Sequence, residues 1–231
     1  MKTKIAVLTG AGVSAESGLN TFRDSNGLWE GHDVMEVASL EGYYRNPELV
    51  LNFYNQRRRQ LHKVRPNEAH LALVKLETSF NVTIITQNVD DLHERAGSSA
   101  VVHLHGELLK VRSTANEQLT LAWDGDLVLG DKCPQGHQLR PHIVWFGELV
   151  PMLEEAARIV NMADIIIIIG TSMQVYPAAS LVHYAANKVP IYFIDPRPNV
   201  SLNDFDNLTI VAKTAVEGVP TLVDTLLHSM A

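Results

Sequence analysis

Two polar stretches of this chain combine residue types that can bind polar ligand groups and move a proton. Gln87-Asn88-Val89-Asp90 follows one apolar run, and His103-Leu104-His105-Gly106 ends another. Amides and carboxylates bind polar ligand groups, and an imidazole titrates near neutral pH and can serve as a general base. Gln87, Asn88 and Asp90 are therefore placed to bind polar groups, and a histidine at the end of the second run, His103 or His105, is a candidate general base. Turn and capping roles for the Asn and Asp, and a structural role for a histidine, are the alternatives.

A glycine-rich segment near the N-terminus predicts half of a nucleotide-phosphate site. Residues 5–9 form an apolar run that leads into Gly10-Ala11-Gly12-Val13-Ser14. Glycine lets a backbone turn tightly and approach a ligand. We expect Ser14 to cap the next helix, whose free N–H groups attract an anion. The third glycine of the dinucleotide fingerprint is replaced by Ala15, so a strand-to-helix turn without a ligand is the alternative.

These segments need a scaffold that ends several strands at one edge. Apolar, β-branched runs predict strands over 5–9, 82–86, 101–103, 165–170, 191–195 and 208–211. Amphipathic patterns between them predict a helix opening at Pro66 and others over 151–162, 178–187 and 216–230. The alternation predicts an α/β fold with a Rossmann-like parallel sheet and helices on both faces.

Two segments break this alternation. Residues 23–65 are rich in aromatic side chains and partly helical, and residues 107–140 are polar and rich in turns. Structureless loops of this length are uncommon in a compact domain, so we interpret both as insertions that form one small module. Residues 1–22, 66–106 and 141–231 would form the large domain, and 1–231 a single catalytic domain. A cleft between module and sheet is the expected ligand site.

Composition narrows the functional class. The chain has 231 residues, 46% of them hydrophobic, and a formal net charge of −7, which argues against nucleic acid or an anionic membrane as a partner. A single cysteine, Cys133, excludes an internal disulfide and fits a reducing compartment. No secretory cleavage pattern is present, and the apolar run 165–169 is too short to span a bilayer. We expect a cytoplasmic monomer.

Taken in order, these motifs resemble those of the sirtuins, which are NAD-dependent protein-lysine deacylases. The resemblance extends over residues 9–195 and is greatest to the bacterial members. The matching segments are Gly10-Ala11-Gly12-Val13-Ser14-Ala15-Glu16-Ser17-Gly18, Phe22-Arg23, Thr86-Gln87-Asn88-Val89-Asp90, His105-Gly106, Pro141-His142-Ile143-Val144-Trp145-Phe146-Gly147-Glu148 and Gly170-Thr171-Ser172.

The resemblance implies NAD as cofactor, with nicotinamide, 2′-O-acyl-ADP-ribose and free lysine as products. It implies that His105 acts as a base on the ribose hydroxyls, that Asp90 binds the nicotinamide amide, and that Asn88 orders the ribose and a water. The other dinucleotide contacts that it implies are Gly10, Ala11, Gly12, Ser14, Phe22, Arg23, Gln87, Gly170, Thr171, Ser172 and Asp195.

The resemblance also implies an acylated-lysine protein or peptide as substrate. The peptide would add as a strand between Phe146-Gly147-Glu148 and the loop that contains Val175, and the Val144 carbonyl would bind the acyl-lysine nitrogen.

Tyr54 and Arg57 bear on the identity of the acyl group. Spaced i, i+3, they share one helix face, and a phenol beside a guanidinium can hold a carboxylate. From the residues alone, a solvated basic helix is the alternative. A Tyr-x-x-Arg pair resembles that of sirtuins which remove succinyl or malonyl groups, and the small Ala38 leaves room for a longer chain. We expect a carboxylate pocket that still accepts acetyl.

The chain departs from the family pattern at the structural zinc. Most sirtuins bind it through four cysteines, whereas here Ser113 and Gly136 stand at two of those positions. Cys133 and His137 offer at most two ligands, and tetrahedral zinc needs four. We predict no zinc. The remaining alternatives for function are a protein mono-ADP-ribosyltransferase, a catalytically silent NAD-binding module and, from the Rossmann-like pattern alone, a hydride-transfer dehydrogenase.

Overall fold

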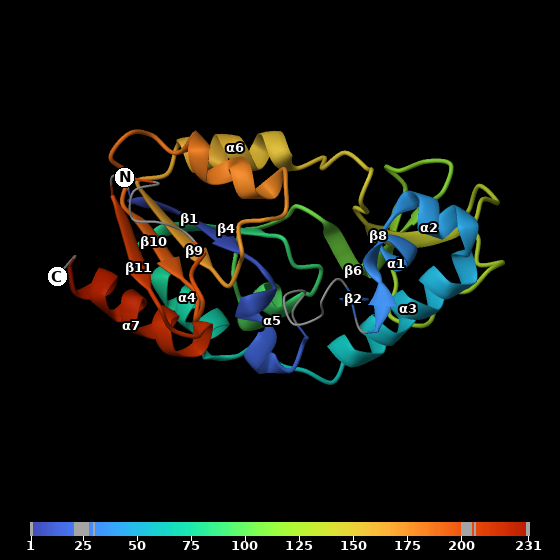
Figure 1. The fold of residues 1–231 in the computed structure, drawn as a ribbon, viewed down its shortest axis with the longest axis horizontal. Coiled ribbons are helices and arrows are strands. Elements are labelled where there is room, and N and C mark those ends of the chain that lie inside the picture. Colours follow the sequence, from blue (N-terminus) through green and yellow to red (C-terminus); the bar gives the residue numbers. More distant parts are fainter. Residues whose placement is uncertain (1, 21–27, 30, 200–204, 206, 230–231) are drawn as a thin grey trace.

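A six-stranded parallel sheet forms the larger half of the molecule (Figure 1). The structure, a computed structural model, describes residues 2–20, 28–29, 31–199, 205 and 207–229. The strand order is β11-β10-β9-β1-β4-β5, and every neighbouring pair is parallel. The strands are β1 (Lys4–Thr9), β4 (Asn81–Thr86), β5 (Val101–His103), β9 (Ile165–Ile169), β10 (Ile191–Ile194) and β11 (Leu208–Val211). Each lies within one residue of its predicted bounds, so the α/β prediction is confirmed.

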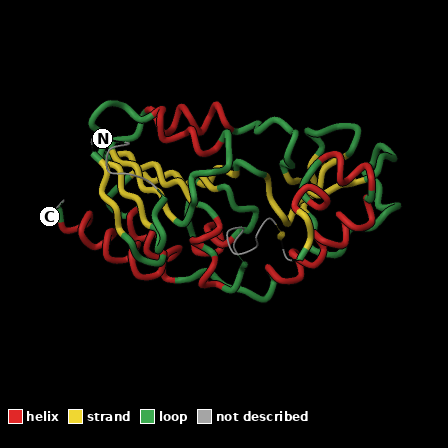
Figure 2. Tube along the Cα trace, viewed as in Figure 1, coloured by secondary structure: helices red, strands yellow, loops and turns green. Residues whose placement is uncertain are grey.

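Helices cover both faces of this sheet because its central strands are apolar on both sides (Figure 2). In β1, Ile5 and Val7 belong to the core on one face, and Ala6 and Leu8 to the core on the other. The first face is covered by α4 (Glu68–Leu76) and α7 (Ala215–His228), and the second by α6 (Leu153–Asn161) and a 3-10 helix (Ala178–Tyr184). A short helix, α5 (Leu92–Ala96), connects β4 to β5.

The helix predicted over 178–187 is wrong in type and length. The structure has a 3-10 helix that ends at Tyr184. Ser180 bonds back to the Pro177 carbonyl through both its N–H (3.0 Å) and its hydroxyl (2.7 Å), which favours the tighter i to i+3 turn. Lys188 then adopts a left-handed conformation (φ 68°) that a continuing helix does not allow.

The smaller half contains a three-stranded antiparallel sheet with the order β7-β6-β8 (Figure 1). Its elements are β2 (Leu28–Trp29), β3 (His32–Asp33), α1 (Val34–Val37), α2 (Leu40–Arg45), α3 (Pro47–Leu61), β6 (Gly106–Ser113), β7 (Thr120–Ala122) and β8 (Leu139–Ile143). A core of its own joins α3 to the antiparallel sheet through side chains such as Phe53, Val111 and Leu139. The predicted insertions supply these elements, although β8 continues beyond residue 140.

None of the helices in the described part of the chain is both long and apolar enough to cross a membrane.

Candidate active site

A cavity of about 470 Å³ opens at the carboxyl ends of β1, β4 and β9 and extends to α3 of the small module. Every predicted site residue that the structure describes lines it. These residues are Gly10, Ala11, Gly12, Ser14, Ala38, Tyr54, Arg57, Gln87, Asn88, Asp90, His105, Val144, Phe146, Gly147, Glu148, Gly170, Thr171, Ser172, Val175 and Asp195. Phe22 and Arg23 lie outside the described residues.

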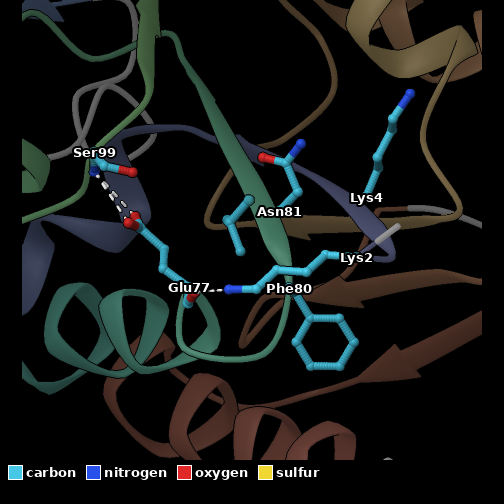
Figure 3. A pocket seen from close by; sticks show the side chains of 7 residues that line it. Lys2, Lys4, Glu77, Phe80, Asn81 and Ser99 are labelled. Atoms are coloured by element: carbon cyan, nitrogen blue, oxygen red, sulfur yellow. Dashed lines mark hydrogen bonds between the residues drawn. The ribbon is translucent and has the colours of Figure 1, made fainter.

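A second hollow, of about 410 Å³, lies at the opposite edge of the sheet, where β1 and β4 begin (Figure 3). The Lys2 ammonium donates to the carbonyls of Glu77 and Thr78, both at 3.1 Å, and the Glu77 carboxylate accepts from the Ser99 N–H at 3.0 Å. These bonds link the end of α4 to the chain segments beside it. Ligands of open α/β sheets bind at the carboxyl ends of strands, so we place the functional site in the first cavity.

The glycine loop packs against a second loop, and this contact accounts for its composition. Gly12 N–H donates to the Gly170 carbonyl at 2.8 Å, and Gly10 N–H donates to the Ile169 carbonyl at 3.0 Å. A Cβ on Gly12 would lie 2.6 Å from the Gly170 Cα, and a Cβ on Gly170 (φ +60°) would lie 2.5 Å from the Gly12 carbonyl carbon. The two loops can meet only without side chains, and together they form one wall of the cavity.

The predicted helix cap at Ser14 is wrong. Two 3-10 turns, Ala11–Val13 and Ala15–Ser17, replace the expected helix, and Ser14 makes no capping hydrogen bond. Its hydroxyl instead donates to Asp90 Oδ2 at 3.0 Å and accepts from Asn88 Nδ2 at 3.2 Å. Ser14 therefore joins the glycine loop to the residues that follow β4.

This hydrogen-bond network fixes the side chains of Asn88 and Asp90, two of the polar residues that follow β4. Asn88 Nδ2 also donates to the Gly10 carbonyl at 3.2 Å, which leaves the amide oxygen as the side chain's remaining polar atom. Asp90 is buried, and burial raises the pKa of its carboxyl group, although hydrogen bonds from the Leu92 N–H and the Ser14 hydroxyl partly offset that rise. The result is a preorganised amide and carboxyl pair at the cavity wall.

His105 is oriented by one backbone carbonyl. Its Nδ1 lies 3.1 Å from the Gln87 carbonyl oxygen, and a carbonyl can only accept, so Nδ1 carries the proton. In the neutral ring Nε2 then keeps a free lone pair, as a general base requires. Burial lowers the pKa of His105, an effect that the Gln87 hydrogen bond partly opposes, so the ring is neutral at physiological pH.

His103, two residues earlier, is placed differently and does not line the cavity. Its Nδ1 lies 3.1 Å from the Asn88 carbonyl, and its Nε2 lies 2.7 Å from Glu94 Oε1. Burial pulls the pKa of His103 down, but the hydrogen bond and the charge of Glu94 outweigh it, and the pKa is raised overall. The two histidines therefore hold consecutive carbonyls of one loop, and only His105 lines the cavity.

The ends of β9 and β10 complete the sheet side of the cavity. The Thr171 hydroxyl accepts from Gln87 Nε2 at 3.3 Å and from the Met173 N–H at 3.2 Å. Asp195 is 2% exposed, and its Oδ1 accepts from the Arg197 N–H at 2.9 Å. The predicted contacts that follow β4, β9 and β10 therefore meet at one edge of the sheet, together with those that follow β1.

The small module contributes an aromatic and cationic end to the cavity. Tyr54 is fully buried on α3, and its hydroxyl oxygen accepts from Trp145 Nε1 at 2.9 Å. One turn later, the Arg57 guanidinium lies 5.0 Å from the centre of the Phe53 ring. Ala38 lines the same region and binds the Phe146 N–H through its carbonyl at 2.9 Å. Tyr54 and Arg57 thus line one cavity, in line with the shared helix face that their spacing predicted.

Glu148 lines the cavity, but its carboxylate is already occupied by protein groups. It accepts from Arg112 Nη2 at 3.0 Å, from Arg140 Nη1 at 2.7 Å and from the Trp145 N–H at 2.8 Å. Burial raises the pKa of Glu148, but the arginines and the Trp145 N–H outweigh it and lower the pKa overall. A contact from this residue to a peptide would therefore use its backbone.

The predicted lack of zinc concerns the region around Cys133. The buried Cys133 thiol lies 3.4 Å from the Ser113 hydroxyl. The backbone N–H of Cys133 donates to the His137 carbonyl at 2.8 Å. Within the described ranges, no three His, Cys, Asp or Glu side chains are grouped so as to hold a metal ion. The absence of zinc remains a prediction.

Sequence reasoning missed several residues that line the cavity, notably Trp29, Trp145, Arg197 and the Thr214–Ala215 pair. Trp145 lies inside the segment 141–148, where the sequence assigns its neighbours Val144 and Phe146 to the substrate site but gives no signal for the indole itself. Thr214 follows the end of β11, so the rule that pointed to the other strand ends applies to it as well. Trp29 belongs to a two-residue strand that carries no pattern of its own.

Comparisons with known proteins agree with this geometry. A model of the Sir2 family matches residues 10–177. A protein of Helicobacter pylori named NAD-dependent protein deacylase is 56% identical over 225 residues, covering 97% of each chain. One of the same name from Bacteroides thetaiotaomicron is 52% identical over 96% of this chain and 97% of its own. A solved complex of a Sir2 homologue with NAD has a TM-score of 0.85 and 38% identity, and covers 100% of this chain and 91% of that one.

Proposed function

The chain belongs to the Sir2 family, and from this premise we propose that it is an NAD-dependent protein-lysine deacylase selective for acyl groups that end in a carboxylate. Succinyl and malonyl are the preferred groups, and acetyl is accepted. The observation that carries this proposal is the position of Tyr54 and Arg57 in the same cavity as His105.

The residues of the cavity fit a dinucleotide. Gly10, Gly12 and Gly170 line one wall of the cavity, where the absence of their side chains lets two loops pack together and leaves a wall of backbone that suits a pyrophosphate. Asp195 offers a buried carboxylate at the end of β10, which suits the hydroxyls of a ribose. Asn88, Asp90 and His105 offer an amide, a carboxyl and an imidazole between this wall and α3. NAD, when bound, supplies the ribose carbon from which nicotinamide departs and to which the acyl oxygen is transferred.

The chain contributes orientation and proton transfer to this reaction. His105 Nε2 takes a proton from a ribose hydroxyl, because Nδ1 is held in the protonated form by the Gln87 carbonyl. Asp90 receives the nicotinamide amide, and the Ser14 hydroxyl fixes the carboxyl for this role. The Val144 N–H donates to the His105 carbonyl at 2.9 Å, so the strand that would bind the acyl-lysine starts beside the base.

Selectivity for an acidic acyl group follows from charge at the buried end of the cavity. A carboxylate loses hydration there, and a guanidinium with a phenol can replace it by charge-assisted hydrogen bonds. Burial raises the pKa of Tyr54 well above its usual value, so the phenol remains a donor at every working pH. An acetyl group offers no charge to this pair and gains nothing from it.

The test uses NAD with matched acetyl-, malonyl- and succinyl-lysine peptides, and follows peptide mass and nicotinamide. We expect Arg57→Met to reduce the succinyl-to-acetyl ratio of kcat/KM by about tenfold or more, which corresponds to one lost charged hydrogen bond. Arg59→Met is the matched control, because Arg59 is exposed on the same helix and pairs with Asp126 at 3.4 Å. Equal losses for both peptides, or transfer of ADP-ribose to protein without deacylation, would contradict the proposal.

The other expectations stay part of the proposal. We propose that the protein is a cytoplasmic monomer without zinc. We also propose that it binds neither nucleic acid nor membrane, in line with its net charge of −7. We also keep the division into a large domain (1–22, 66–106 and 141–231) and a small module (23–65 and 107–140).

A further inference from the structure

A row of side chains supports the acyl end of the cavity from behind. Trp145 is 2% exposed, and its indole Nε1 donates to the Tyr54 hydroxyl oxygen at 2.9 Å. The Arg140 guanidinium lies over the indole, 3.5 Å from the ring centre. Arg140 also donates to both carboxylate oxygens of Glu148, at 2.7 and 2.9 Å. The row therefore connects the loop that follows β8 with a phenol on α3.

The hydrogen bond between Trp145 and Tyr54 has a fixed direction. An indole N–H can only donate, whereas a phenol both donates and accepts. Because Trp145 occupies an acceptor position of the Tyr54 oxygen, the Tyr54 proton must point away from the indole. Among the described residues, the Tyr54 hydroxyl accepts this bond and donates none. Tyr54 is fully buried and lies among the residues that line the cavity, so we infer that a ligand reaching this buried end would receive the proton.

The indole itself is held in place on several sides. The backbone N–H of Trp145 donates to the Glu148 carboxylate at 2.8 Å. Each oxygen of that carboxylate also accepts from Arg112 at 3.0 Å. The side chains of Arg112, Arg140 and Glu148 are 5%, 7% and 12% exposed, and such buried, bidentate pairs fix geometry. The Tyr43 ring packs 5.0 Å from the indole. The donor that faces Tyr54 is therefore preorganised.

We propose that Trp145 is a positioning residue that determines acyl specificity, because its indole N–H makes the Tyr54 hydroxyl a dedicated donor to the terminal carboxylate of the acyl group. This inference rests on the proposed function and names a residue through which that function selects its substrate. Without the indole N–H, the phenol could place its proton in other directions, and its oxygen would lose a buried partner. Turnover of an acetyl peptide would not be affected by this change, since an acetyl group carries no terminal carboxylate.

The test is Trp145→Phe, which keeps an aromatic ring under Arg140 and removes the N–H. We expect the succinyl-to-acetyl ratio of kcat/KM to fall about three- to tenfold, mainly through a higher KM for the succinyl peptide. In a Tyr54→Phe background the same substitution should change the ratio no further, because the hydroxyl it orients is gone. Tyr43→Phe is the matched control: it removes a hydroxyl from the same aromatic cluster, but Tyr43 does not line the cavity, and the ratio should stay unchanged.

The outcomes separate the inference from the proposed function. A wild-type enzyme without preference for succinyl over acetyl would overturn the proposed selectivity and the inference with it. A wild-type preference that survives in Trp145→Phe would overturn the inference alone. A fall in the ratio that is additive with Tyr54→Phe would show a merely structural role and would also overturn it. So would equal losses of kcat/KM for both peptides, which leave the ratio unchanged. Thermal unfolding of each variant confirms that folded proteins are compared.

Discussion

At the scale of single residues, one hydrogen bond decides what His105 can do. The Gln87 carbonyl fixes the proton on Nδ1, and burial keeps the ring neutral. The neighbouring His103 is held by Glu94 and has a raised pKa. Two histidines two residues apart therefore have pKa values shifted in opposite directions, because one meets a carboxylate and the other does not.

This difference predicts the pH dependence of activity. The base works when His105 is neutral, and its pKa is lowered from 6.5, so kcat/KM should decline only below pH 6.5. The measurement is kcat/KM for a succinyl peptide from about pH 5 to 9 at saturating NAD. His105→Ala should be slower by about a hundredfold or more and should lack the acid limb. An acid limb centred above 6.5, or one that persists in the variant, would contradict the assignment.

Most of the candidate site could be predicted from the residues that follow the strands, because a parallel sheet brings strand ends together. Ser14 shows the limit of that reasoning. Local capping preference suggested a helix start, but the partner of its hydroxyl is Asp90, 76 positions away. Trp145 shows another limit, because only the three-dimensional structure reveals the direction of a buried N–H.

At the scale of elements, the contact between two loops explains why glycine occupies both. We predict that Gly170→Ala abolishes NAD binding and destabilises the protein by roughly 2–5 kcal/mol, because its Cβ would meet Gly12 and its φ is +60°. Calorimetry with NAD and thermal unfolding measure the two effects. Gly125→Ala is the control, since a Cβ there meets nothing within 4 Å. Normal NAD binding by the Gly170 variant would show that the loops tolerate separation.

A buried histidine pair links other elements behind the glycine loop. The His70 and His93 rings on α4 and α5 are 4.8 Å apart. His93 Nε2 lies 3.1 Å from the Thr9 hydroxyl, and His70 Nδ1 lies 3.0 Å from Asn67 Oδ1. Asn67 Nδ2 in turn donates to the Val13 carbonyl at 2.9 Å. Burial lowers the pKa of His70 to about 4 and that of His93 to about 3.

We therefore predict an acid-sensitive fold. Below pH 6.5 the unfolded chain binds protons at both positions while the folded chain does not until about pH 4, so acid favours unfolding. The free energy of unfolding should fall by a few kcal/mol, as an order of magnitude, between pH 6.5 and 4. Denaturant titrations across this range should show a shallower slope for His70→Gln and an unchanged slope for the exposed His62→Gln. The same slope for all three proteins would rule out this pair as the cause.

The type and bounds of some helices and strands could be predicted from the sequence, and those of others could not. The strands of the large sheet were found within a residue because their runs are apolar on both faces. The segment at 178–187 carries an apolar pattern that fits two kinds of helix, and side-chain bonding by Ser180 selected the tighter one. The two-residue strands β2 and β3 left no periodicity to find.

At the scale of the whole molecule, the cavity of the candidate site extends from the sheet to a small module with a core of its own, and we predict that this core is stable without a metal. Cys133 packs among Val111, Leu127 and Leu139 in that core. We predict that a strong chelator leaves the melting temperature unchanged and that elemental analysis finds no stoichiometric zinc. The positive control is a different protein with a structural zinc, from which the same chelator removes the metal. A drop in melting temperature that zinc reverses would contradict the prediction.

The most direct test of the central claim is a competition between acetyl- and succinyl-lysine peptides of one sequence, mixed at equal concentration with NAD and followed by mass spectrometry. Competing substrates divide in the ratio of their kcat/KM values. We predict that the succinyl peptide is consumed first and that each lysine freed releases one nicotinamide. Equal consumption of the two peptides, or nicotinamide release with both peptides intact, would contradict the account.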